Sequence, residues 1–249
     1  MDRYEQALRA LVDTLQQTPP TVCCDKAERS ALHTFVGTLQ GTPGAGPEEF
    51  VCTAQATTAE TIPVGISNRH VHLSRADVET LFGVGYQLTP LKELSQPGQF
   101  SAKETVTIAG PKRLLEHVRI LGPERPQTQV ELLRGDCIKL GIEPCIRISG
   151  DITQSPGITL IGPEGSVRLP EGVIVAQRHI HMTPQDADRF GVCDGDHVCI
   201  KLVGSRGGVY DQVVIRATPS SSLDCHLDIE EANGMGIGPK TTAHIVNCI

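Results

Sequence analysis

The feature that most constrains the fold of this chain is a short pattern that occurs twice, Arg-His-apolar-His followed by the start of a helix. It reads "SNRHVHLS" at residues 67–74 and "AQRHIHMT" at residues 176–183, so the two copies lie 109 positions apart. In each copy an Asp stands three residues after a Ser or Thr, as at a helix N-cap, and "FGV" follows. Val64 matches Val173 at the same offset. An internal duplication of this kind predicts two similar domains.

The pattern of apolar and turn-forming residues after about residue 60 indicates β-structure. Short apolar or alternating runs such as "ETVTIAGP" and "GITLIGPEG" are separated by Gly and Pro, and "HVCIKLVGSRGGVYDQVVIRA" is typical of a hairpin around "GSRGG". With no Trp, three Tyr and five Phe, the core must come from Val, Ile, Leu and Ala. We therefore expect a mainly β fold with short helices (α+β), built from two similar β-barrel domains.

The first sixty residues have a different character. Leu8, Leu11 and Leu15 share one face of an amphipathic helix that we expect within residues 1–20. A second short helix and a Gly/Pro-rich linker are expected over residues 21–60. The chain thus carries an N-terminal helical extension ahead of the β-rich part.

Charge and composition exclude several classes of partner. The net charge is -7, and the sequence has no cluster of Lys and Arg of the kind that lines a nucleic-acid groove, so no nucleic acid is expected. No apolar run approaches the roughly 18 residues that span a membrane. The charged N-terminus does not resemble a signal peptide, and the nine cysteines form no C-x-x-C pair, which indicates reduced thiols in a bacterial cytosol.

The paired histidines indicate metal chemistry. Residues two apart in a strand point to the same side, so His70 and His72 present two imidazoles on one face, as do His179 and His181. Two neutral imidazoles at this separation suit one transition metal, most often zinc. A single H-x-H pair is more often structural, but the duplication strengthens the metal interpretation.

Each pair still needs a third protein ligand, and two segments offer one. In "GPERPQTQVELL", Arg125 and Glu131 share one parity, although an ordinary solvated strand face is the alternative. In "SSLDCHLDIEEANG", His226 lies on the polar face while Cys225 points into the core. Cys225 is therefore a poor candidate for a ligand or a nucleophile.

Five blocks of the sequence carry a family resemblance. "GISNRHVHLS", "LSQPGQF", "GPERPQTQVE", "QRHIHMTP" and "HLDIEEAN" are similar to, and in the same order as, the motifs of the PduL-type phosphotransacylases, the phosphate propanoyltransferases of bacterial microcompartments. The resemblance runs from about residue 61 to the C-terminus. It implies two similar β-barrels with a dimetal site between them. It also implies reversible transfer of an acyl group, usually propanoyl, between CoA and phosphate.

The resemblance also implies roles for individual residues and two zinc ions per chain, with other divalent metals as alternatives. One zinc would be held by His70, His72 and Glu131, and the other by His179, His181 and His226. Arg125 would bind phosphate and act in catalysis. Contacts with CoA would come from Ile66, Ser67, Asn68 and Lys92.

The same resemblance implies a targeting role for the expected N-terminal helix. Family members of microcompartments carry a short amphipathic N-terminal helix that targets them to the shell interior, and "MDRYEQALRALVDTLQQ" is similar to it. We expect a homo-oligomer in the microcompartment lumen, within the cytoplasm, that contacts shell or core proteins. We divide the β-rich part into a first domain, residues 68–170, and a second, residues 61–67 with 171–249.

Two other functions compete with this interpretation. A cupin is also a metal-binding β-barrel with an H-x-H pair, but its Glu follows within a few residues, where "LSRADVE" predicts a helix start instead. A non-catalytic microcompartment scaffold would use structural zinc, which is usually enclosed by four protein ligands, often Cys. The cysteines here do not cluster with the histidines in the sequence.

Overall fold

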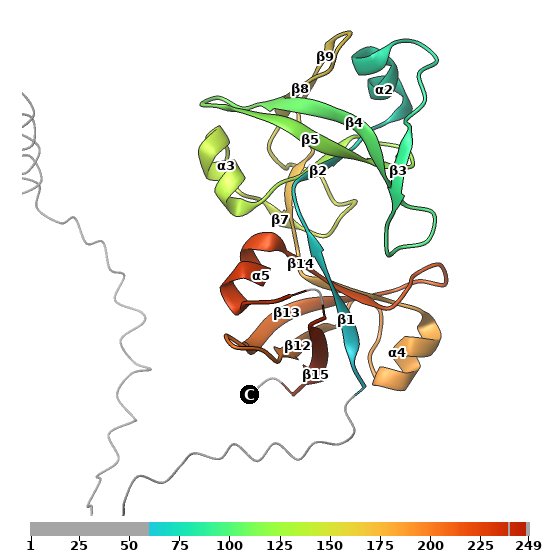
Figure 1. The fold of residues 1–249 in the computed structure, drawn as a ribbon, viewed down its shortest axis with the longest axis vertical. Helices are drawn as coiled ribbons and strands as arrows, with labels where there is room; N and C mark the ends of the chain where they lie inside the picture. Colours follow the sequence, from blue (N-terminus) through green and yellow to red (C-terminus); the bar gives the residue numbers. More distant parts are fainter. Residues whose placement is uncertain (1–59, 239, 248–249) are drawn as a thin grey trace, which may run out of the picture. The chain divides into compact units, whose positions relative to one another are not determined.

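A computed structural model of the chain describes residues 60–238 and 240–247. The helix expected within residues 1–20 lies outside the described residues, as do the second helix and the linker up to residue 59. The described residues belong to one unit by their contacts, and Figure 1 shows two β-structures within it.

One of the two β-structures is a closed barrel of six strands, which we call the closed barrel. Its strands run in the order β1-β14-β11-β13-β12-β15 and back to β1. Two helices follow strands of this barrel, α4 (Pro184–Phe190) after β11 and α5 (Ile229–Met235) after β14. The strands are β1 (Ile62–Ser67), β11 (His179–Met182), β12 (His197–Leu202), β13 (Gly208–Ala217), β14 (Asp224–Asp228) and β15 (Thr242–Val246).

The other β-structure is an open, curved sheet with two further helices, α2 (Arg75–Phe82) and α3 (Arg134–Leu140), which we call the curled sheet. Its strand order is β7-β10-β6-β2-β5-β4-β8-β9, with β3 paired to β4. The strands are β2 (His70–His72), β3 (Pro90–Glu93), β4 (Phe100–Ala109), β5 (Leu114–Gly122), β6 (Gln129–Glu131), β7 (Ile146–Arg147), β8 (Ile158–Ile161), β9 (Ser166–Leu169) and β10 (Val173–Ala176). The predicted fold class, mainly β with short helices, is confirmed; the second barrel closes, whereas the first remains a half-barrel.

The duplication is visible in the strand pairing. β2 lies between β5, which is parallel to it, and β6, which is antiparallel. β11 lies in the same way between parallel β13 and antiparallel β14. The two histidine pairs therefore occupy the same place in two equivalent three-stranded arrangements.

The strand that precedes each histidine pair lies in one half of the molecule, and the histidine pair itself lies in the other half. β1 runs parallel to β14 in the closed barrel, although β2, its successor, lies in the curled sheet. β10 runs parallel to β6 in the curled sheet, although its successor β11 lies in the closed barrel. The expected domain boundary at residue 171 groups β10 with the closed barrel, whereas its partners are β6 and β7. This exchange brings the ends of β1 and β10, and so both histidine pairs, to the junction of the two halves.

Helix caps fix the segments that follow the histidines. The Ser74 hydroxyl accepts a hydrogen bond from the backbone N–H of Asp77 at the start of α2. Thr183 forms a full capping box with Asp186 at the start of α4. Both helix starts lie where the sequence predicted them.

Each half has its own aliphatic core. The core of the curled sheet includes Val71, Leu81 and Ile120, and that of the closed barrel includes Ile180 and Ile200. In both histidine strands the apolar residue between the histidines points into the core, as Val71 and Ile180 do. The histidines are thereby directed to the opposite face. None of the helices in the described part of the chain is both long enough and apolar enough to cross a bilayer.

Candidate functional site

The first cluster consists of His70, His72 and Glu131, on the adjacent strands β2 and β6. His70 lies directly opposite Glu131 in the ladder, so their side chains share one face. His70 Nε2 lies 3.4 Å from Glu131 Oε2, and His72 Nε2 lies 3.8 Å from Glu131 Oε1. All three residues are buried, and their ligand atoms lie within 4.8 Å of one another.

Hydrogen bonds orient the members of this cluster. The Nδ1 atom of His70 lies 2.8 Å from the carbonyl oxygen of Asn68, so Nδ1–H donates there and Nε2 is the ring nitrogen that faces Glu131. Glu131 Oε1 accepts hydrogen bonds from Gln129 Nε2 at 2.7 Å and from Ser149 Oγ at 2.9 Å. Glu131 Oε2 therefore remains the oxygen that faces His70.

The second cluster consists of His179, His181 and His226, on β11 and β14. His179 lies opposite His226 in the ladder, and the Nε2 atoms of His179 and His181 are 3.1 Å apart. The Nδ1 atom of His179 lies 2.8 Å from the carbonyl oxygen of Gln177, so Nε2 is the ring nitrogen that faces His181. The ligand atoms of these three histidines also lie within 4.8 Å of one another. Asp224 Oδ2 lies 3.0 Å from His226 Nε2.

The protonation states suit metal binding. Burial, with the nearby imidazole of His70, lowers the pKa of His72 to about 3, and burial with the charge of His226 lowers the pKa of His179 to about 4. Both imidazoles are therefore neutral at pH 7, as ligands must be. Burial opposes ionisation of Glu131, but the His70 imidazole holds the pKa of this carboxyl well below its ordinary value. The converging imidazoles and the one carboxylate form a donor set that fits zinc or a similar divalent ion.

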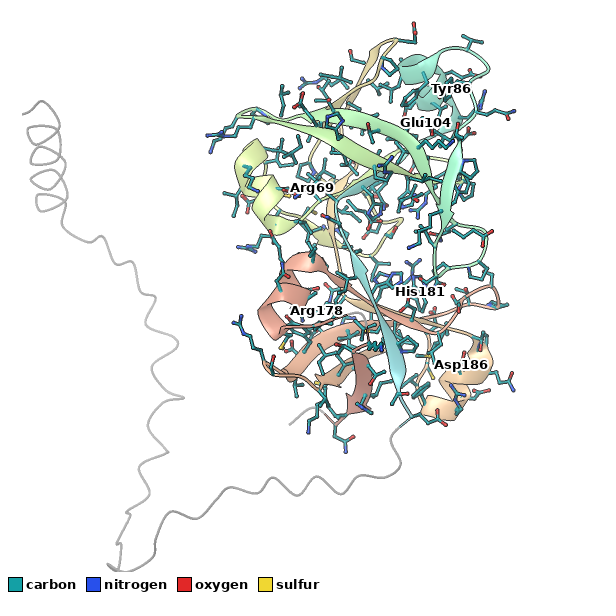
Figure 2. All side chains as sticks on the ribbon, viewed as in Figure 1. Arg69, Tyr86, Glu104, Arg178, His181 and Asp186 are labelled. Carbon is teal, nitrogen blue, oxygen red and sulfur yellow. The ribbon has the colours of Figure 1, made fainter. Side chains whose placement is uncertain are left out.

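Both clusters line a single cavity of about 420 Å³, to which the closed barrel and the curled sheet both contribute. Arg125 lines the same cavity, and its Nη1 donates to Ser149 Oγ at 3.0 Å. In Figure 2, His181 lies where the two halves face each other. The structure thus brings all seven metal and phosphate candidates from the sequence to one cavity.

The residues expected to contact CoA divide into two groups. Ile66, Ser67 and Asn68, at the end of β1, line the cavity. Lys92 lies on β3, is exposed and does not line it.

Several residues at or beside the site were missed in the sequence. The arginine of each doubled pattern binds a helix: Arg69 Nε donates to Asp136 Oδ2 of α3 at 2.6 Å, and Arg178 Nε donates to Glu231 of α5. Figure 2 shows these two arginines in the two halves. The Arg that recurs in both copies of the pattern could have indicated this role, because Asp136 and Glu231 lie at equivalent places in the two halves. Three more such residues, Gln129, Asp224 and Arg216, were recognisable only as polar residues on a strand.

Two buried cysteines, Cys137 and Cys225, have thiols of low reactivity. Cys225 lies wholly in the core of the closed barrel, as the sequence predicted, and burial raises its pKa to about 12. Burial, with the charge of Asp136, raises the pKa of Cys137 to about 11. Neither thiol forms a reactive thiolate at neutral pH.

Fold and site together define a β-rich protein with two histidine-based clusters of candidate metal ligands on one cavity, built from a duplicated unit. The chain matches the phosphate propanoyltransferase family over residues 63–238. It is 53% identical to the phosphate propanoyltransferase of Thermotoga maritima over 186 residues, which are 74% of this chain and 89% of that protein. It is 48% identical to that of Rhodopseudomonas palustris over 200 residues, 80% of this chain and 83% of the relative. The match to the enzyme of Enterococcus faecalis is 46% over 199 residues, 80% of this chain and 94% of the relative. The chain therefore belongs to the phosphate propanoyltransferase family.

Proposed function

We propose that this protein is a phosphate acyltransferase that converts propanoyl-CoA and phosphate reversibly to propanoyl phosphate and CoA. The observation that carries the proposal is the convergence of both ligand clusters and Arg125 on one cavity. The names of the relatives supply the propanoyl group and phosphate, and the family resemblance supplies CoA as the acyl carrier. Propanoyl is the preferred acyl group, and acetyl is the smaller alternative.

The two clusters are proposed to hold two zinc ions. His70, His72 and Glu131 would hold one, and His179, His181 and His226 the other. When bound, such ions act as Lewis acids that stabilise a thiolate and a phosphate oxygen. Three protein ligands per cluster leave positions for substrate atoms, whereas a structural zinc site is usually enclosed by four.

The reaction requires a weak nucleophile to attack a thioester. A phosphate oxygen forms a bond to the carbonyl carbon, the C–S bond breaks, and the sulfur leaves with the electron pair as a thiolate. The site must therefore place phosphate close to the carbonyl and offset its charge. Arg125 suits this role, because its planar guanidinium can donate to two phosphate oxygens while Ser149 holds one arm in place. Ile66, Ser67 and Asn68 would contact the CoA chain near the cavity, and Lys92 would contact its outer part.

We propose direct attack by phosphate, without an acyl-enzyme. Among the described residues, Cys137 and Cys225 are buried thiols with raised pKa values, which argues against them as nucleophiles. The test is to mix the enzyme with radiolabelled propanoyl-CoA in the absence of phosphate. No covalent label is expected, and a stoichiometric burst of labelled protein would overturn direct attack.

The function itself is tested by phosphate-dependent release of free thiol from propanoyl-CoA, with and without a metal chelator. The proposal predicts release that needs phosphate, is abolished by chelation and returns with zinc. Release of thiol without phosphate would indicate a hydrolase. No turnover of CoA esters in the metal-loaded protein would favour a cupin-like enzyme of other chemistry or a non-catalytic microcompartment scaffold.

We also propose that the protein works in the lumen of a bacterial microcompartment as a homo-oligomer, with residues 1–20 as the targeting helix. The support is the amphipathic spacing of Leu8, Leu11 and Leu15, in a segment outside the described residues. Deletion of residues 1–20 should leave catalytic activity unchanged and abolish encapsulation. Unchanged encapsulation of the truncated protein, or loss of its activity, would contradict this assignment.

A further inference from the structure

Arg216 lies beside the second cluster. It is on β13, directly opposite His181 of the parallel strand β11, and residues opposite each other in a ladder point to the same face. Its neighbours Val213 and Ile215 alternate with the cavity-facing residues and lie in the barrel core. The side chain of Arg216 therefore leaves the barrel on the face that carries the histidines, and it lines the same cavity.

Within the described part of the chain, the guanidinium of Arg216 has no partner at contact distance. Over residues 60–238 and 240–247, no hydrogen bond or ion pair within 4.0 Å involves it. Burial lowers the pKa of Arg216, and the charges of the Glu131 and Asp194 carboxylates only partly offset this effect. A partly buried cation with five donors and no acceptor is costly unless a ligand supplies the acceptors.

Arg125 and Arg216 lie close enough to affect each other. The positive charge of Arg216, after burial, is among the causes that lower the pKa of Arg125. Both guanidiniums line the cavity, one from each half of the molecule, and among the described residues the neutral Ser149 hydroxyl is the one hydrogen-bond partner of the Arg125 guanidinium. An anion held between these two cations would offset their mutual repulsion.

We propose that Arg216 is a second phosphate-binding residue, which with Arg125 holds inorganic phosphate and the phosphate group of the acyl phosphate from two sides. This inference rests on the proposed function. A phosphate dianion has enough acceptor oxygens for both guanidinium groups, and each contact is a charge-assisted hydrogen bond. Because one arginine comes from each half, the phosphate site is complete only when the closed barrel and the curled sheet are together.

The reacting phosphate fits this position better than a phosphate of CoA does. Arg216 is paired with His181, a member of a metal-ligand cluster, so it lies where the reacting atoms meet. The phosphates of CoA are separated from its thiol by the whole pantetheine arm. When the CoA sulfur is at the clusters, the phosphates of CoA lie far from Arg216, toward the outside of the cavity.

The test compares Arg216→Gln and Arg216→Lys with the wild-type enzyme, with Arg206→Gln as the matched control. Arg206 is exposed in the turn between β12 and β13, away from the cavity lining. The zinc-loaded full chain is assayed for KM of phosphate and of propanoyl-CoA, and calorimetric titration with inorganic phosphate measures binding without turnover. Loss of one charge-assisted pair weakens binding about tenfold to a hundredfold. We expect that rise in the KM and Kd of phosphate in Arg216→Gln, a smaller rise in Arg216→Lys, and no change in KM of propanoyl-CoA.

The outcomes separate the inference from the function on which it rests. Unchanged phosphate binding and KM in Arg216→Gln, with normal wild-type activity, would overturn the role of Arg216 and leave the function standing. A raised KM for propanoyl-CoA alone would assign Arg216 to a phosphate of CoA instead, and would also overturn it. If the wild type fails to release thiol, the proposed function fails, and the calorimetric titration still decides whether Arg216 binds phosphate. A Kd for phosphate that is the same in Arg216→Gln and Arg206→Gln would then overturn the inference.

Discussion

Glu131 and His226 occupy equivalent positions in the two halves, opposite His70 and His179 respectively. Two residues before each, a side chain of matching chemistry supports it: Gln129 donates its amide N–H to Glu131, and the Asp224 carboxylate faces Nε2 of His226. The carboxylate that would bind metal is held by a donor, and the imidazole that would bind metal is held by an acceptor. The duplication has therefore diverged as a unit, giving one cluster with an anionic ligand and one made of imidazoles alone.

The anionic ligand is open to a direct test. Glu131→Gln keeps the size of the side chain but replaces a carboxylate, the oxygen ligand that zinc prefers, with an amide. The zinc content of the purified protein should fall from about two to about one ion per chain, with loss of phosphate-dependent thiol release. Elemental analysis after dialysis checks this. Glu116→Gln, at an exposed position on β5, is the control and should retain both ions.

Asp224 provides a test of the imidazole cluster. Asn at this position preserves the shape but removes the charge that lies 3.0 Å from His226 Nε2. Loss of such a supporting carboxylate should weaken zinc binding about 10- to 100-fold. Competition with a chromophoric chelator measures it, with Asp188→Asn, exposed on α4, as the control. Equal zinc affinities in the two variants would exclude a role for Asp224.

The close packing of Asp224 and His226 against β1 requires a glycine at position 65. A Cβ at this position would lie 2.8 Å from Asp224 Oδ2 and 3.0 Å from His226 Cδ2, closer than side-chain carbons approach other atoms. Gly65→Ala should displace His226 and reduce kcat/KM about tenfold to a hundredfold, without unfolding the protein. Gly204→Ala is the control, because the nearest heavy atom would lie 3.9 Å away. Full activity in Gly65→Ala would mean that the strand shifts without cost.

The features that the sequence predicted are those governed by local spacing. The two-residue period of a strand placed His70 with His72, and it put His226 on the polar face and Cys225 in the core. It could not reveal that Glu131 pairs with His70, because that register depends on β2 and β6 meeting in the sheet.

Contacts between distant segments were beyond the reach of a local pattern. Arg216 follows three apolar residues on β13 and is recognisable as a cavity residue only once β11 lies beside it. The open edge of the curled sheet likewise depends on which strands find partners, which the duplication alone does not determine. Arg69 and Asp136 are 67 positions apart, so the partner of the repeated arginine could not be read from the repeat itself.

The pair formed by Arg69 and Asp136 should stabilise the strand that carries the first histidines. Two hydrogen bonds join the side chains, at 2.6 and 3.0 Å, and Asp136 is only 1% exposed whereas Arg69 is 34% exposed. Asp136→Ala leaves the guanidinium next to His70 without its acceptor, which should cost about 2 to 3 kcal/mol in the free energy of unfolding. Urea unfolding of the full chain, followed at equilibrium, measures this loss. Asp151→Ala is the matched control, because Asp151 forms an exposed pair with Arg147 at 3.6 Å and should contribute less than about 0.5 kcal/mol. Equal losses in the two variants would show that the buried pair orients Arg69 without stabilising the fold.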